Sequence, residues 1–290
     1  MIASTLITGL ALGSMYGLMA LGFHITYAVS KTVNFSQGSA MMFGAVMGYT
    51  FMVTLGGPFW IGIPAALASC ALLGLAIERV LVRPFAARGS DAWLMATVAG
   101  GIVLDNVVLF TFGKEPRSLP SPFTESAIEV FGTGAYPLQL MIPVVGLSIA
   151  MALTLVTTKT KLGKAMLASV QRPEAARLTG VNTQAVIAAS FAISAVFAGI
   201  AGLLIAPLFN VSSGMGLIFG IKAFAAAIIG GISSAWGVMI AGILYGCIEA
   251  LTTAYIGSSY TQIVSFSVVI LVLVTTVPNG LFGRAALKKV

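Results

Sequence analysis

Nine apolar runs, each close to the length that crosses a lipid bilayer, follow one another along this 290-residue sequence. A spanning helix needs about 20 mostly apolar residues, so these runs predict membrane helices. The seventh run is short and ends at a Gly-Gly pair, so it either spans the bilayer or re-enters it. We predict an all-α polytopic membrane protein with about eight to nine transmembrane or re-entrant helices in a single transmembrane domain, 1–290. The runs cover residues 5–27, 36–55, 60–82, 92–112, 138–157, 185–207, 216–232, 236–254 and 260–277.

The scarcity of charged residues excludes a soluble fold. Charged residues make up 8% of the chain and apolar residues 58%, whereas ordinary soluble domains contain about 25% charged residues. The helices are therefore expected to contact membrane lipids. The net charge of +7 does not indicate a nucleic-acid partner, because the basic residues cluster beside the apolar runs, as membrane topology requires.

Three clusters of basic residues predict the orientation in the membrane. They follow the third, the fifth and the last apolar run, so they lie on one side if every run spans. The positive-inside rule makes that side cytoplasmic, which places the N-terminus outside and the C-terminus in the cytoplasm. The clusters are Arg79, Arg83 and Arg88; Lys159, Lys161, Lys164, Arg172 and Arg177; and Arg284, Lys288 and Lys289.

The loop at residues 158–184 is the longest charged connection on that side. Pro173 suits the first position of a helix, Glu174 stands in the first turn, where the helix dipole favours an anion, and Gly180 suits the C′ position. The pattern predicts a capped two-turn helix outside the membrane that docks against a partner. The alternative is a solvated loop whose basic residues serve only the topology.

Four short motifs resemble the permeases of the branched-chain amino acid importer family. They are Glu174-Ala175-Ala176 with Gly180, Asn34-Phe35-Ser36-Gln37-Gly38, Glu78-Arg79 with Arg83-Pro84, and Gly230-Gly231-Ile232-Ser233-Ser234 with Gly237. The resemblance extends over nearly the whole chain. It departs at Ser36-Gln37, where typical members carry Ala-His, and this difference bears on the substrate.

The resemblance implies an ABC (ATP-binding-cassette) importer permease bundle that moves amino acids, branched-chain or related, across a bacterial inner membrane by alternating access. It implies as partners two ABC ATPase subunits that bind ATP and Mg, a second homologous permease, and a periplasmic or extracellular substrate-binding protein. The sequence itself has no phosphate-binding loop and no catalytic or metal-binding motif, so we expect a transport subunit without a cofactor of its own. Within the cytoplasmic coupling loop, 158–184, the residues expected to contact the ATPase are Lys164, Arg172, Glu174, Ala175, Ala176, Arg177 and Gly180.

Polar residues inside the apolar runs are candidates for function because they are costly in a membrane. At about 1.5 Å per helical residue, Lys222 lies ~15 Å and Glu249 ~20 Å from the turn at 233–235. We therefore predict a buried ion pair, which either braces two helices or contacts substrate. Asp105, next to Asn106, is expected near mid-membrane, either lining a polar pathway or held neutral by hydrogen bonds.

Asn34 and Gln37 allow two interpretations. Asn34 is a plausible N-cap, with Gln37 at the third helical position as a capping-box variant. A helix start that faces inward could also hold a substrate carboxylate. At the level of the whole chain, the alternative function is an ion-coupled secondary transporter or channel for small polar solutes, in which Asp105 or the Lys222–Glu249 pair binds the coupling ion.

Overall fold

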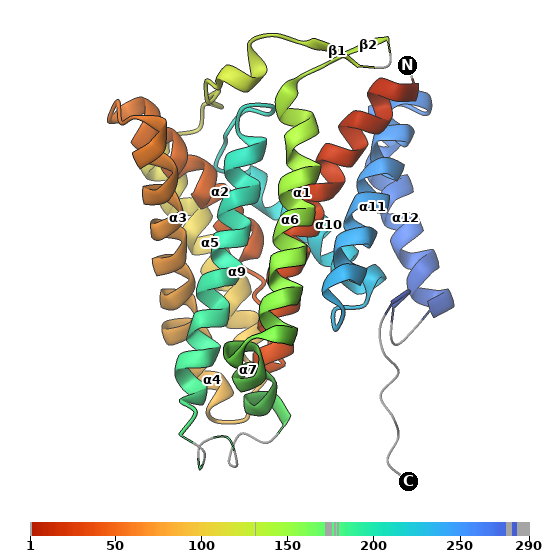
Figure 1. The fold of residues 1–290 in the computed structure, drawn as a ribbon. Coiled ribbons are helices and arrows are strands. Elements are labelled where there is room, and N and C mark those ends of the chain that lie inside the picture. The colour runs from red at the N-terminus through yellow and green to blue at the C-terminus, as the bar shows by residue number, and fades with distance from the viewer. Residues whose placement is uncertain are drawn as a thin grey trace.

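The long first helix, α1 (Ile2–Ser30), runs through the middle of the bundle. The computed structural model describes residues 2–130, 132–171, 176, 178, 180–276 and 280–282. Helix α1 contacts α6 (Pro137–Lys159), α9 (Thr183–Ile205), α10 (Met215–Gly230) and α11 (Ala235–Tyr255). Most of its side chains are buried by these neighbours. An apolar helix surrounded in this way forms the core of the bundle (Figure 1).

The remaining elements complete the bundle, and α2 among them is largely buried. Helix α2 (Gln37–Tyr49) continues into the π-helical η1 (Thr50–Thr54), and α3 (Phe59–Ala76) continues through the π-helical η2 (Ile77–Val82) into α4 (Arg83–Ala86). The others are α5 (Trp93–Phe112), η3 (Pro122–Thr124), the hairpin β1 (Ile128–Val130) and β2 (Thr133–Ala135), α7 (Lys161–Gln171) and α12 (Ser258–Thr276).

All nine predicted runs are helical in the part of the chain that the structure describes. Within the described ranges, six helices are long and apolar enough to cross a membrane: α1, the continuous α3–α4 segment, α5, α6, α9 and α11. Helices α10 and α12 are apolar but shorter, and α2 reaches its full length only with η1. The predicted all-α polytopic fold is confirmed.

A seam of glycines joins α1 to α11. A Cβ atom on Gly13 would lie 2.6 Å from Cα of Ile243, and one on Gly9 would lie 2.8 Å from Cα of Cys247. Small residues that allow backbones to approach this closely are typical of helix pairs in membranes. The stripe at Gly9, Gly13 and Gly17 is therefore a packing surface of α1.

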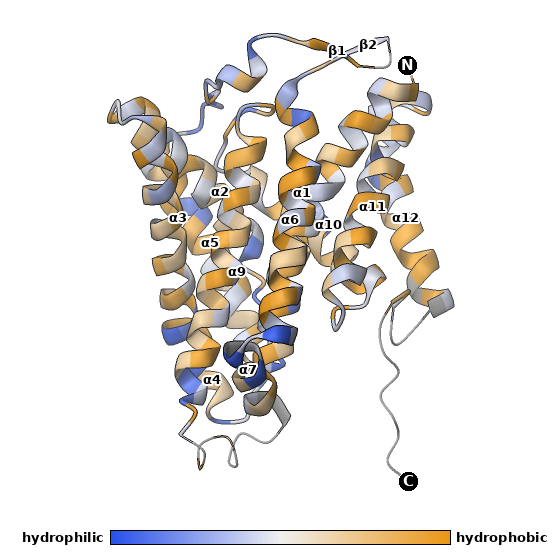
Figure 2. Cartoon of the chain, viewed as in Figure 1, coloured by the Kyte–Doolittle hydropathy of each residue, from blue (hydrophilic) through white to orange (hydrophobic). Residues whose placement is uncertain are grey.

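The two ends of the bundle differ in polarity. The β1–β2 hairpin covers one end, and α4 and α7 lie at the other, where Figure 2 shows hydrophilic residues below a mostly hydrophobic body. The basic residues Arg83 and Lys161 belong to this second end. The last cluster, 284–289, lies outside the described residues.

The predicted capping box before α2 is wrong. The helix begins at Gln37, with Ser36 rather than Asn34 at the N-cap and no side-chain cap hydrogen bond. The Gln37 side chain turns away from Asn34 and bonds to Ser194 on α9. Because the Gln37 amide is fully buried, it requires partners on a neighbouring helix, and this requirement overrides the local pattern.

Candidate functional site

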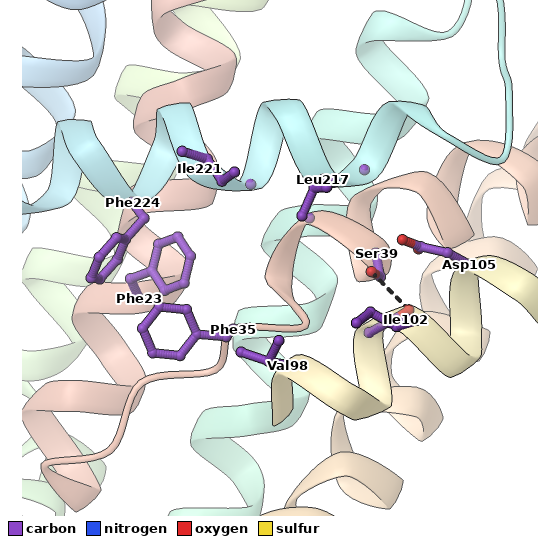
Figure 3. A pocket seen from close by; sticks show the side chains of 13 residues that line it. Phe23, Phe35, Ser39, Val98, Ile102, Asp105, Leu217, Ile221 and Phe224 are labelled. Carbon is purple, nitrogen blue, oxygen red and sulfur yellow. Dashed lines mark hydrogen bonds between the residues drawn. The ribbon is translucent and has the colours of Figure 1, made fainter. Parts of the chain in front are cut away.

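A cavity of about 260 Å³ lies between α1, α2, α5 and α10. Its wall is almost entirely apolar, and among the described residues only Asp105 lines it with an ionisable side chain. Figure 3 shows Asp105 and Ser39 at one end, and the aromatic rings of Phe23, Phe35 and Phe224 gathered at the other. The cavity therefore has one charged end and one apolar end.

The carboxylate of Asp105 is not neutralised by a partner in the described part of the chain. Its Oδ1 atom is buried and has no hydrogen-bond donor there. The nearby hydroxyl of Ser39 donates to the carbonyl of Gly101, at 3.2 Å. Asn106, the neighbour in sequence, is exposed and donates from Nδ2 to the carbonyl of Ile102 on its own helix, at 2.8 Å. Asp105 and Asn106 therefore do not act as a pair, and only Asp105 lines the cavity.

The main chain folds tightly just before α2. Oδ1 of Asn34 accepts from the N–H of Ser36, at 3.1 Å, and the Ser36 hydroxyl donates to the carbonyl of Thr97 on α5. Gln37 donates from Nε2 to the carbonyl of Ser194, and the Ser194 hydroxyl donates back to Oε1 of Gln37. These bonds hold the first turn of α2 between α5 and α9. Asn34 and Gln37 thus position the helix start beside the cavity without lining it themselves.

The predicted ion pair between α10 and α11 is present. Nζ of Lys222 lies 2.5 Å from Oε1 of Glu249, and the Tyr16 hydroxyl on α1 donates to Oε2 of the same carboxylate, at 2.9 Å. Lys222 is 7% exposed and Glu249 is 9% exposed. The pair therefore ties three helices together in the interior of the bundle. Tyr16 was not predicted from the helix spacing, although a hydroxyl in the middle of an apolar run was the available signal.

Helix α10 separates the ion pair from the cavity. Gly220, Ile221 and Phe224 line the cavity, whereas Phe219 and Lys222 contact Tyr16 of α1. The two candidate sites therefore lie on different faces of one short helix, and they form two separate centres.

Arg83 and Glu78 form a second charged pair, which was not predicted from the sequence. Nε and Nη2 of Arg83 donate to the two carboxylate oxygens of Glu78, at 2.9 and 2.8 Å. The π-helical turn of η2 separates these residues by five positions. Both residues of this pair belong to the motif Glu78-Arg79 with Arg83-Pro84, so the sequence contained the signal for the contact. Such a two-bond arginine–carboxylate contact fixes geometry as well as charge, and it stabilises the junction of α3 and α4.

The predicted coupling loop is described only in part. Arg172, Glu174, Ala175 and Arg177 lie outside the described residues, and so does most of the predicted two-turn helix. In the described part, Lys164 is exposed on α7 and Ala176 is buried.

The end of the predicted two-turn helix is visible. Gly180 has a φ of +83°, and the N–H of Val181 donates to the carbonyl of Ala176, at 3.0 Å. A left-handed glycine followed by this hydrogen bond, which spans six residues, is the Schellman motif that ends many helices. Gly180 therefore occupies the predicted C′ position. Leu178, which was not among the predicted coupling residues, is 90% exposed.

Comparison with known proteins identifies the family. The model of the family described as "Branched-chain amino acid transport system / permease component" matches residues 5–273. The chain belongs to this family. Because the match covers almost all of the bundle, the cavity, the ion pair and the α7 end are all parts of a permease component, and the predicted resemblance is confirmed.

Individual relatives agree over nearly their whole length. The chain is 34% identical to the high-affinity branched-chain amino acid transport system permease protein LivH of Salmonella typhimurium, over 97% of this chain and 96% of that protein. It is 32% identical to BraD of Pseudomonas aeruginosa, a permease protein of the same description, over 98% and 97%. It is 27% identical to the ribose import permease protein RbsC of Haemophilus influenzae, over 90% and 81%.

Proposed function

We propose that this chain is the membrane permease subunit of an ATP-driven ABC importer that carries branched-chain amino acids, or closely related amino acids, inward by alternating access. The near full-length identity with LivH and BraD is the observation that carries the proposal. The weaker similarity to a ribose permease supports the transport class but not the sugar as substrate. The protein itself is a transport subunit of its family and not an enzyme.

The α7 end is the proposed contact with two ABC ATPase subunits, which would bind ATP and Mg²⁺. Lys164 is exposed there, Leu178 projects from the coupling loop, and Gly180 ends the helix that carries Leu178. An exposed apolar side chain would gain from burial against a partner, while the charged residues in the sequence of the loop would set the orientation. Closure of the ATPases would then push on the loop at residues 158–184.

The proposed orientation places the α4–α7 end in the cytoplasm and the β1–β2 hairpin outside. Six described basic residues lie at the α4–α7 end, within η2, α4, the end of α6 and α7 or just after α4: Arg79, Arg83, Arg88, Lys159, Lys161 and Lys164. The connection after α5 mixes Lys114 and Arg117 with Glu115, Glu125 and Glu129, so it carries no basic excess. This bias supports a cytoplasmic C-terminus and an external N-terminus in a bacterial inner membrane.

A second homologous permease would cover the face on which the cavity opens. The residues at its rim include Ile102, 56% exposed, and Leu217, 62% exposed. An external substrate-binding protein would deliver the amino acid to the hairpin side. Two permeases facing one another across the cavity would enclose a path between the two sides.

Uptake measurements test the proposed function. The gene is deleted in its host, and uptake of radiolabelled leucine at low concentration is compared with that of a strain complemented by the wild-type chain. We expect complementation to restore uptake, and the affinity-purified chain to carry two ATPase subunits and a second permease identified by mass spectrometry. Uptake that collapses with a protonophore while cellular ATP is maintained would instead indicate an ion-coupled transporter.

A further inference from the structure

The cavity between α1, α2, α5 and α10 has the size of a single small solute. Its volume of about 260 Å³ is below the roughly 300–1,000 Å³ that drug-sized ligands occupy. Exposed residues at its rim, including Leu217, leave one side open to the surface of the chain. A small molecule could therefore enter from the face that the second permease would cover.

The charged end of the cavity suits a cation. In the part of the chain that the structure describes, Asp105 supplies the only formal charge in the wall, and no residue donates a hydrogen bond to its buried Oδ1 atom. A carboxylate in apolar surroundings is costly unless it is paired. A primary ammonium group, with three N–H donors, provides both the opposite charge and the missing donor.

Two helix N-termini meet at the same cavity. Gly38 and Ser39 belong to the first turn of α2, Gly216 and Leu217 belong to the first turn of α10, and all four line the wall. The helices approach so closely that a Cβ atom on Gly216 would lie 2.7 Å from the carbonyl oxygen of Gly38. The first N–H groups of a helix have no acceptor within the helix and carry partial positive charge. Two such ends favour an anionic group beside the cation bound at Asp105.

The opposite end of the cavity is aromatic. The ring centroids of Phe23 and Phe224 lie 5.5 Å apart, and those of Phe35 and Phe224 lie 5.0 Å apart. These rings offer no charge and no strong hydrogen-bonding group (Figure 3). A short aliphatic chain would gain from burial against them at about 25 cal/mol per Å² of apolar surface.

We propose that this cavity is a transient binding site within the permease for one zwitterionic amino acid. The ammonium group lies at Asp105, the carboxylate lies against the first turns of α2 and α10, and the aliphatic side chain lies against Phe23, Phe35 and Phe224. The inference rests on the proposed function, because it assigns the transported solute to this cavity. It adds a recognition step by the permease itself to the selection made by the binding protein.

Photo-crosslinking tests the site directly. The complete permease–ATPase complex, without its binding protein, is placed in lipid nanodiscs and irradiated with photo-leucine, an amino acid that carries a diazirine on its aliphatic chain. Crosslinked peptides are mapped by mass spectrometry. We expect labels on the peptides that contain Phe23, Phe35 or Phe224. Leucine should compete, whereas 4-methylpentanoate, which lacks the ammonium group, and isoamylamine, which lacks the carboxylate, should compete about tenfold less well or worse.

Two variants of α5 distinguish loss of the binding site from general disruption of the protein. Asp105→Asn keeps the shape but removes the charge, and it should lower labelling about tenfold or more. Thr111→Val alters an exposed hydroxyl that bonds to its own helix, and it should label as the wild type does. Co-purification of the ATPases with each variant shows whether the complex is intact.

Several results would overturn the proposal. These are labels away from the cavity, no specific label in the wild type, equal competition by either truncated analogue, or an intact Asp105→Asn complex that labels normally. If Asp105→Asn does not assemble, the label positions and the competition in the wild type decide alone. If the labelling or competition results contradict the site while ATP-dependent leucine uptake is normal, only the site is rejected. Absence of leucine uptake in the wild type would reject the proposed function.

Discussion

Breaking the Lys222–Glu249 pair from one side should destabilise the permease more than removing both charges. The side chains of Lys222 and Glu249 are 8% and 11% exposed, and Nζ of Lys222 lies 2.5 Å from Oε1 of Glu249. At an effective dielectric constant of about 20 and a charge separation of ~4 Å, their attraction is about 4 kcal/mol. Loss of one partner leaves the other charge buried and unpaired, at a cost of about 3–5 kcal/mol. We expect losses of this size for Lys222→Met and for Glu249→Gln.

The double variant should be more stable than either single variant, because it strands no charge. Replacing a whole buried pair with neutral groups of similar volume is often nearly neutral. Tyr16→Phe removes only the donor to Glu249, so it should cost an intermediate amount, about 1.5–3 kcal/mol. Lys161→Met, at an exposed position of α7, is the matched control and should change stability by less than about 0.5 kcal/mol.

The assay is denaturant-induced unfolding of the purified permease in detergent, followed by loss of helical circular dichroism. The wild type, the two single variants and the double variant form a double-mutant cycle. Additive losses would refute the reasoning, since they would mean that the two charges do not stabilise one another. Each residue would then have to be reconsidered as a separate group of the transport path.

Three further predictions concern packing, coupling and orientation. Gly13→Ala should destabilise the bundle by about 1–3 kcal/mol in the same unfolding assay, because its Cβ overlaps α11. Gly134→Ala, whose Cβ would make only ordinary contacts, is the control. Equal losses of stability in the two variants would contradict close packing of α1 on α11 at Gly13. Glu174→Arg should abolish uptake or release the ATPases while the permease stays inserted, and wild-type uptake with normal co-purification would reject the coupling loop. A single cysteine at the exposed Glu115 should react with a membrane-impermeant thiol reagent on whole cells, and one at the exposed Lys164 should not; labelling at Lys164 would reverse the orientation.

The membrane bundle was predictable from the sequence because hydrophobic run length is a local property. Each run contains its own signal, and the structure has a helix at each one. The ion pair was also predictable, because Lys222 and Glu249 flank one short turn and the rise per residue fixes their depth. Their contact therefore needed only the assumption that consecutive helices lie side by side.

The start of α2 shows where local reasoning failed. Asn34 and Gln37 have the spacing of a capping box, but Gln37 makes its bonds to Ser194, which is 157 residues away in the sequence. A buried amide that finds two partners on another helix outweighs one local cap, which contributes about 1 kcal/mol. No spacing rule contains that information, because it depends on which helix lies opposite.

The cavity was unpredictable for the same reason, and its position explains why Asp105 and Asn106 could not be told apart in the sequence. Its wall combines residues of α1, α2, α5 and α10, and it forms only where Gly38 and Gly216 allow two helix starts to meet. Adjacent residues on a helix point about 100° apart, so only one of the two polar side chains of α5 can face such a cavity. The sequence predicts a polar group at this depth, whereas the packing of four helices decides that Asp105 is the one that could meet a substrate.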